Sequence, residues 1–196
     1  MLSSMQLPML KVGATVPDFT LMMCMPGETV MRPLCESFRL SDRLKGGDIV
    51  IVFVGGAFFG DCTREVCDFR DNLTIFQEEG YGVYAFNTLG HFWNAAFIRS
   101  TRLNFPIICD AKNEIAPRIW DIYNASPVPF VLQNRSARHG LMIISKDGRV
   151  AHVATHEKPE TWLGLEKAFQ GYEPRSRLVQ RILTPGALGA GRKPPD

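Results

Sequence analysis

Two cysteines five positions apart, Cys62 and Cys67, are the residues of this chain best suited to chemistry. A continuous, mostly β-branched run at 49–54 precedes them, and apolar residues at helical spacing follow. Cys62 is therefore predicted where a strand passes into a helix. Free N–H groups and partial positive charge at a helix N-terminus stabilise a thiolate, the reactive form of cysteine. Cys67 could trap an oxidised Cys62 as a disulfide, so the segment indicates redox chemistry.

The segments around this pair predict alternating strands and helices. We expect strands near 17–23, 49–54, 81–86, 105–109, 140–145 and 149–155, and helices near 63–77, 92–98, 111–123 and 159–169. Residues 30–40 read as a strand with a loop, and 126–139 as a loop. A Lys-Asp-Gly turn joins the last two strands as a hairpin. This order predicts an α/β fold with a central mixed β-sheet flanked by helices.

Composition divides the chain into three parts. Residues 1–10 are predicted to be an extension, 11–170 one domain, and 171–196 a basic tail that contains proline and glycine. The tail also holds an apolar cluster at near-helical spacing, which includes Ile182 beside Arg181. Because exposed apolar segments often mark interaction sites, the tail is predicted to dock on a protein partner or a larger complex.

Overall composition limits the classes of function. With 196 residues, of which 45% are hydrophobic, the chain can form a core, and its net charge of +2 gives no case for nucleic-acid binding. No run approaches about 18 apolar residues, so no membrane span is predicted. Residues 1–10 carry no secretory signal and the five cysteines are an odd number. We therefore expect an intracellular, cytoplasmic protein, with a mitochondrion or plastid left open.

Four segments, in order, resemble a known family. Residues 11–21, Lys-Val-Gly-Ala-Thr-Val-Pro-Asp-Phe-Thr-Leu, resemble the opening of peroxiredoxins, the alkyl hydroperoxide reductase and thiol-specific antioxidant family. Residues 62–71, Cys-Thr-Arg-Glu-Val-Cys-Asp-Phe-Arg-Asp, resemble the active-site helix of its peroxiredoxin Q, or bacterioferritin comigratory protein, subgroup. Residues 105–110 and the hairpin at 141–148 also resemble family segments. The resemblance covers about 11–170.

This resemblance implies a thioredoxin-like fold and a thiol peroxidase. Cys62 matches the peroxidatic cysteine, which attacks a hydroperoxide and becomes a sulfenic acid. Cys67 matches the resolving cysteine, which condenses with it to a disulfide. Thioredoxin or a similar dithiol then reduces the disulfide. The resemblance implies no metal and no organic cofactor.

The chain departs from the family pattern around Cys62. The family motif is Pro-x-x-x-Thr-x-x-Cys, and here Gly55 and Phe59 stand at the proline and threonine positions. The family also has an arginine before the hairpin that stabilises the thiolate. Direct register places His139 there, and Arg138, one residue earlier, is the candidate substitute. These departures predict an attenuated peroxidase.

Other interpretations remain open from the residues alone. Cys62 and Cys67 could be inert buried cysteines, or a Cys-x₄-Cys half of an iron–sulfur site, although no third close cysteine follows. The chain could also be a degenerate domain retained as a structural or interaction subunit. The remaining cysteines are interpreted as structural, and the scattered histidines as surface or hairpin residues: Cys24, Cys35, Cys109, His91, His139, His152 and His156.

Overall fold

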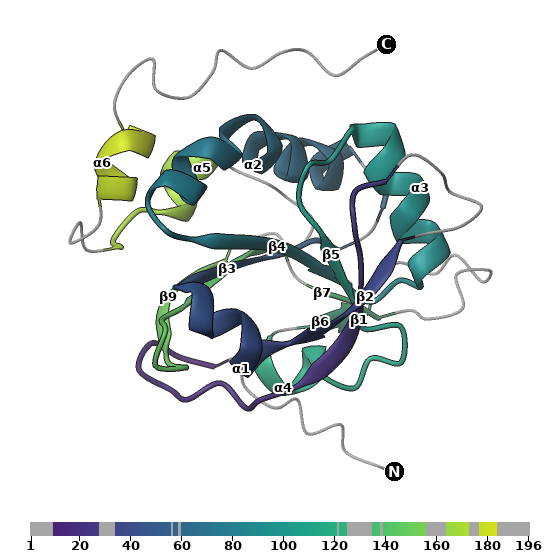
Figure 1. Ribbon diagram of the computed structural model, residues 1–196, viewed down its shortest axis with the longest axis horizontal. Helices are drawn as coiled ribbons and strands as arrows, with labels where there is room; N and C mark the ends of the chain where they lie inside the picture. The colour runs from purple at the N-terminus through teal and green to yellow at the C-terminus, as the bar shows by residue number, and fades with distance from the viewer. Residues whose placement is uncertain are drawn as a thin grey trace.

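A computed structural model describes residues 10–27, 34–55, 57–58, 60–120, 122–124, 135–137, 139–155, 164–172 and 177–183. In these residues a seven-stranded sheet lies between two layers of helices (Figure 1). The predicted α/β architecture with a central mixed sheet is therefore confirmed.

The main sheet has the strand order β2-β1-β5-β4-β3-β8-β9. Its strands are β1 (Thr20–Cys24), β2 (Cys35–Arg39), β3 (Ile49–Phe53), β4 (Gly82–Asn87), β5 (Ile107–Cys109), β8 (Gly140–Ile144) and β9 (Val150–Thr155). The central strands β3, β4 and β5 are parallel. The flanking strands are antiparallel to their neighbours, including the predicted hairpin β8–β9. The six expected strands and the strand near 30–40 are thus found.

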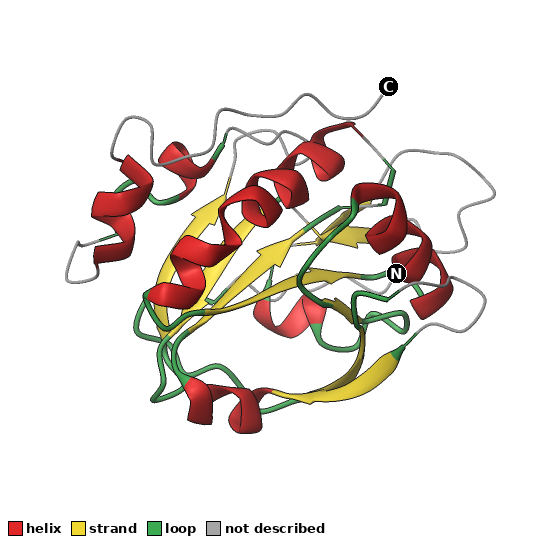
Figure 2. Cartoon of the chain, turned by 45° about the horizontal axis from the view of Figure 1, so that its top comes forward, coloured by secondary structure: helices red, strands yellow, loops and turns green. Residues whose placement is uncertain are grey.

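Helices cover both faces of this sheet. One layer contains α2 (Gly60–Glu78), α3 (His91–Thr101), α5 (Leu165–Ala168) and α6 (Arg177–Leu183); the other contains α1 (Leu40–Arg43) and α4 (Ala116–Ile119) (Figures 1 and 2). A short 3₁₀ turn, Leu44–Gly46, follows α1. None of the described helices is long and apolar enough to span a membrane.

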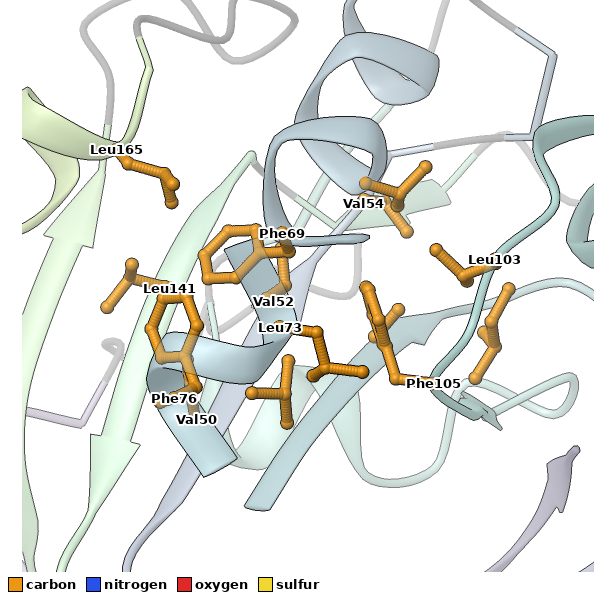
Figure 3. Close-up of a cluster of buried hydrophobic side chains, with 14 of the residues drawn as sticks. Val50, Val52, Val54, Phe69, Leu73, Phe76, Leu103, Phe105, Leu141 and Leu165 are labelled. Atoms are coloured by element: carbon orange, nitrogen blue, oxygen red, sulfur yellow. The ribbon is translucent and has the colours of Figure 1, made fainter. Parts of the chain in front are cut away.

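The longest helix, α2, is held against the sheet by its apolar side. Phe69, Leu73 and Phe76 are buried, and they point toward valines of β3, whose five residues are all buried (Figure 3). Full burial of one such large side chain stabilises a fold by about 1.5–3 kcal/mol. This packing explains the continuous apolar run at 49–54 and fixes the N-terminus of α2 at the end of β3.

The helix expected at 111–123 is mostly absent, which corrects that prediction. Only α4 (Ala116–Ile119) is helical, and β6 (Ile122–Asn124) instead pairs with β7 (Arg135–Ala137) as a separate two-stranded sheet. The buried carboxylate of Asp110 accepts hydrogen bonds from the backbone N–H groups of Glu114, Ile115 and Ala116. These bonds hold 110–116 as a turn, so the helix begins only at Ala116.

Two further expectations change in the second half of the chain. The strand β7 lies within the segment predicted as a loop, 126–139, most of which is outside the described residues. The closing helix predicted at 159–169 appears as α5 (Leu165–Ala168), and 159–163 lie outside the described residues.

Part of the predicted tail packs against its own domain. The side chain of Ile182 in α6 is buried in the same core as α2. Arg181 forms ion pairs with Glu78 and Glu79 at the C-terminal end of α2, at 2.7 and 3.3 Å. Two of the side chains that predicted an external partner therefore already have partners within the chain. The described tail residues are 171–172 and 177–183, and residues 1–9 of the predicted extension are outside the description.

Candidate active site

Helix α2 places Cys62 in its first turn, at the edge of the sheet where β3 ends. The helix begins at Gly60, three residues before the predicted start at Thr63. Cys62 is therefore the third helical residue, close to the strand-to-helix junction where it was predicted, and only 3% of it is exposed. First-turn N–H groups lack partners within the helix, so the local backbone favours a negative charge on this sulfur.

His139 lies directly against Cys62. Its Nε2 atom is 3.3 Å from the Cys62 sulfur, and the ring is buried, with 1% exposed. The sequence had interpreted His139 as a surface or hairpin residue, and that interpretation is wrong. Direct register had placed His139 at the position of the family arginine before the hairpin, so the sequence held a signal for a role at the thiol. The contact itself depends on how β8 meets α2.

Glu65 holds the other side of the His139 ring. Its Oε2 atom forms a very short contact with His139 Nδ1, and the carboxyl group is fully buried. Glu65 was not among the site residues predicted from the sequence. The available signal was its place one helical turn after Cys62, which puts both side chains on one side of α2.

The three side chains form a chain of ionisable groups, Cys62–His139–Glu65. Burial raises the pKa of Glu65 to about 7, although the contact with His139 opposes this rise. Burial acts to lower the pKa of His139, but hydrogen bonds with Cys62 and Glu65 outweigh it and raise that pKa to about 10. Between these two pH values Glu65 is a carboxylate and His139 an imidazolium.

An imidazolium can donate from both ring nitrogens, whereas a neutral ring has one donor. His139 then donates from Nδ1 to Glu65 and from Nε2 to the Cys62 sulfur. A cation beside a cysteine stabilises the thiolate over the thiol. The arrangement can thus hold Cys62 as a nucleophile, with Glu65 fixing the orientation of the ring.

The backbone at Gly140 fixes His139 relative to the sheet. Gly140 has φ +147, and a Cβ atom there would lie 2.1 Å from the carbonyl oxygen of Ala154. Only glycine lets β8 begin this close to β9. Because Gly140 directly follows His139, the same close approach sets where the imidazole ring enters the core.

Cys67 is partly buried and lies one and a half turns further along α2. Neither cysteine is in a disulfide, and the helix is continuous through them. Burial raises the pKa of Cys67, with Arg70 acting in the opposite direction. Residues five apart in a helix have Cα atoms about 8.7 Å apart, beyond the roughly 4.4–6.8 Å that a disulfide spans. The structure therefore has the geometry expected for a reduced pair.

The approach to Cys62 contains two unusual features. Phe58, just before α2, has φ +67, a rare conformation for a bulky residue, and half of it is exposed (52%). Its ring packs edge-on against Phe97 of α3, with centroids 5.4 Å apart. The carboxylate of Asp61, next to Cys62, pairs with Arg64 at 3.2 Å, which offsets its charge. Strained backbone of this kind is frequent beside functional groups.

Other predicted site residues fall outside the description. Gly55 is described and buried, whereas Phe59 and Arg138 are outside the described residues. The role predicted for Arg138 therefore remains a prediction. Within the described part of the chain, no group of three His, Cys, Asp or Glu side chains could hold a metal ion.

Comparison with known proteins identifies the family. The family model described as the AhpC/TSA family matches residues 12–153. A protein of Mycobacterium tuberculosis with a provisional peroxiredoxin name is 32% identical over 107 residues, covering 55% of this chain and 64% of that relative. Peroxiredoxin TSA1 of Saccharomyces cerevisiae is 24% identical over 158 residues, covering 74% of this chain and 76% of the relative. The match thus covers less than two thirds of the length of the mycobacterial relative.

Solved structures give the same result for the fold. The crystal structure of peroxidoxin BcpB from Mycobacterium tuberculosis superposes with a TM-score of 0.63 and 25% identity, covering 77% of this chain and 90% of that one. Mycobacterium bovis AhpC also superposes with a TM-score of 0.63, at 17% identity, covering 80% and 88%. The thioredoxin-like fold that the resemblance implied is thereby confirmed. The chain therefore belongs to the AhpC/TSA family, and within it resembles peroxiredoxins of the bcp type.

Proposed function

We propose that this chain is a thiol-dependent peroxidase in which Cys62 is the peroxidatic cysteine. The observation that carries the proposal is the contact between Cys62 Sγ and His139 Nε2, backed by Glu65. A thiolate at Cys62 attacks the terminal oxygen of a hydroperoxide and breaks the O–O bond. An alcohol or water leaves after taking up a proton, and Cys62 becomes a sulfenic acid.

Cys67 completes the cycle in this proposal. Its thiolate attacks the sulfenic sulfur of Cys62, water leaves, and a disulfide forms after the first turns of α2 unwind. A thioredoxin-like dithiol then reduces the disulfide. His139 does for the thiolate what the family arginine does, because both supply a hydrogen-bonding cation.

We also propose that Arg138, the predicted substitute for the family arginine, assists Cys62 as a second cation. The Glu65 Oε1 atom is buried and has no hydrogen-bond partner among the described residues. Such an atom is a favourable place for a positive donor. If Arg138 assists Cys62, replacing it with methionine should slow the reaction with hydroperoxide while replacement with lysine should restore part of the rate.

The decisive experiment is consumption of hydrogen peroxide coupled to NADPH through thioredoxin and thioredoxin reductase. Turnover should require Cys62 and be lost in Cys62→Ser. In Cys67→Ser one peroxide per chain should be consumed, with a dimedone adduct at Cys62, but no turnover with thioredoxin should follow. Cys35→Ser is the matched control and should turn over normally. Turnover that persists in Cys62→Ser would refute the proposal.

We further propose that the rate is attenuated, since Phe59 replaces a hydroxyl donor with a phenyl ring. One preorganised donor is worth about 100-fold in rate. Phe59→Thr, alone and with Gly55→Pro, should raise the second-order rate constant with hydrogen peroxide. A wild-type rate that restoration leaves unchanged would show that His139 already compensates.

The second proposal, a degenerate interaction subunit, has one observation in its favour. Phe92 and Trp93 at the start of α3 are 58% and 63% exposed. Neighbouring apolar side chains exposed in this way often mark a surface that binds another protein. This alternative predicts no sulfenic acid at Cys62 after hydrogen peroxide and a defined complex in native cell extract that Trp93→Lys disrupts. Sulfenic acid at Cys62 with turnover would reject it.

A further inference from the structure

Three cysteines outside the peroxidatic helix form a cluster near the edge of the sheet. Cys24 of β1 has its sulfur 3.7 Å from the sulfur of Cys35 in β2 and 3.7 Å from that of Cys109 in β5. The sequence had interpreted all three as structural. Side chains from separate strands, 85 and 11 positions apart in the chain, are thus brought into one group of free thiols.

The strand register singles out one pair in this cluster. Cys24 lies directly opposite Cys35 in the antiparallel pair β1–β2. The adjoining pair is hydrogen bonded, because the N–H of Met25 donates to the carbonyl of Leu34 at 2.8 Å. Cys24 and Cys35 therefore occupy a non-hydrogen-bonded position, where Cα atoms are about 4.5 Å apart. This separation lies within the roughly 4.4–6.8 Å that a disulfide spans.

Cys109 is placed less favourably for a bridge. It lies opposite Met22, not Cys24, so Cys24 and Cys109 are diagonal neighbours. Diagonal residues have Cβ atoms roughly 7 Å apart, whereas a disulfide brings them to about 3.8 Å. A Cys24–Cys109 bridge would require the strands to shift, and a Cys24–Cys35 bridge would not.

The surroundings separate the three thiols by accessibility. Cys24 is fully buried and Cys109 nearly so, while Cys35 on the edge strand is only partly buried. Helix α3 covers the inner two: the carbonyl of His91 accepts a hydrogen bond from Cys24, and the amide of Asn94 donates to Cys109 at 3.0 Å. A reagent from solvent therefore reaches Cys35 first.

We propose that Cys24 and Cys35 form a second dithiol–disulfide couple, separate from Cys62 and Cys67. This second couple exchanges with low-molecular-weight disulfides of the glutathione class. The couple does not depend on peroxidase activity, since its oxidant is a disulfide. The Cys24–Cys35 disulfide joins the edge strand β2 covalently to β1. Whether this link is present therefore depends on the ratio of thiol to disulfide in the surroundings.

The exchange proceeds in two balanced steps. A Cys35 thiolate attacks one sulfur of the external disulfide, breaks its S–S bond and forms a mixed disulfide, and one thiolate leaves. Cys24 then attacks the Cys35 sulfur, forms the Cys24–Cys35 bond and expels the second thiolate. Two protein thiols are oxidised and one external disulfide is reduced to two thiols, which take up the two protons.

The third cysteine has a place in the second step. The contact with Cys109 raises the pKa of Cys24, and the same contact lowers the pKa of Cys109. The sulfur of Cys109 lies 3.7 Å from that of Cys24, close enough to relay the proton of Cys24 toward the leaving thiolate as Cys24 attacks. Cys109 acts as a positioning residue and stays outside the final bridge.

The test is disulfide mapping of the full-length wild-type chain after equilibration across a series of glutathione to glutathione disulfide ratios. Trypsin leaves Cys24 and Cys35 on one peptide, since Arg32 precedes a proline, but cleavage after Glu28 by a glutamate-specific protease separates them. The expected result is a disulfide joining fragments 1–28 and 29–36. The bridged fraction should rise as glutathione disulfide increases and reach one half at a defined ratio of glutathione to glutathione disulfide. Thiols at every ratio, a glutathione adduct alone on Cys35, or a bridge from 1–28 to 80–114 would each overturn the proposal.

Variants sharpen this result. The bridge should persist in Cys62→Ser/Cys67→Ser, which lacks the peroxidatic pair, and should be absent in Cys35→Ser. In Cys109→Ser the same bridge should form, but its closure after the mixed disulfide should be at least several-fold slower. Loss of the bridge in a folded Cys109→Ser, or an unchanged closure rate, would contradict the role given to Cys109. Circular dichroism of each variant distinguishes these outcomes from misfolding.

Discussion

The Nε2 atom of His139 lies 3.3 Å from the sulfur of Cys62, although 77 positions separate the two residues. No segment of the chain by itself places an imidazole there. The contact forms because α2 and β8 both adjoin β3, one through the loop at its end and the other as its antiparallel neighbour.

His139→Gln should slow the reaction of Cys62 with hydrogen peroxide by about 10- to 100-fold, since glutamine keeps a hydrogen-bond donor but removes the cation. The rate of sulfenic acid formation, measured by rapid quenching with dimedone and peptide mass spectrometry, checks this. His91→Gln, at an exposed histidine, is the control and should not change the rate. Equal rates in the two variants would remove His139 from the site.

Stability should fall as pH rises through the range in which Glu65 and His139 titrate. The folded pKa of His139, about 10, exceeds the ordinary 6.5, so its contribution is complete below pH 6.5 and is lost as pH passes through 10. Glu65, raised from 4.5 to about 7, acts in the same direction at lower pH. The slope is at most about 1.4 kcal/mol per pH unit for each proton.

Urea unfolding at pH 6, 8 and 10 checks this dependence. At pH 6 the free energy of unfolding should be larger for the wild-type chain than for His139→Gln, and this difference should shrink as pH rises to 10. A difference that stays constant over this range would mean that the proton on His139 is not held by the fold.

Oxidation should unwind the beginning of α2. Because a Cys62–Cys67 disulfide cannot form at helical Cα separations of about 8.7 Å, the first turns must open before the bond closes. Hydrogen exchange of peptides within 60–70 should become faster after one equivalent of hydrogen peroxide. In Cys67→Ser the same treatment should leave exchange unchanged, and faster exchange there would separate the opening from the disulfide.

The C-terminal helix α6 should stabilise the domain itself. Ile182→Ala should lower the free energy of unfolding by about 2–4 kcal/mol, because it leaves a cavity in the core shared with α2. Urea titration measures this change. Arg177→Ala, at an exposed residue of the same helix, should have an effect within about 0.5 kcal/mol. An unchanged midpoint for Ile182→Ala would restore the prediction of a tail that serves an external partner.

The sequence by itself determined the local features of this protein. The apolar run at 49–54 specified a buried strand, the spacing in 63–77 specified a helix, and Cys62 was predicted at the junction between them. The hairpin β8–β9 followed from its turn residues, where Gly148 has φ +81. Each depends on residues close together in the chain, so periodicity and turn chemistry were enough.

Only the tertiary structure decided which distant side chains meet. Glu65 and His139 reach each other because β8 pairs with β3, and Cys24, Cys35 and Cys109 meet because β1 inserts between β2 and β5. Strand order and register are set by packing of the whole sheet, and a shift of one residue in a strand would turn its cysteine to the other face. Burial then changed their chemistry, since ionisation energies depend on the surrounding groups and not on the sequence neighbours alone.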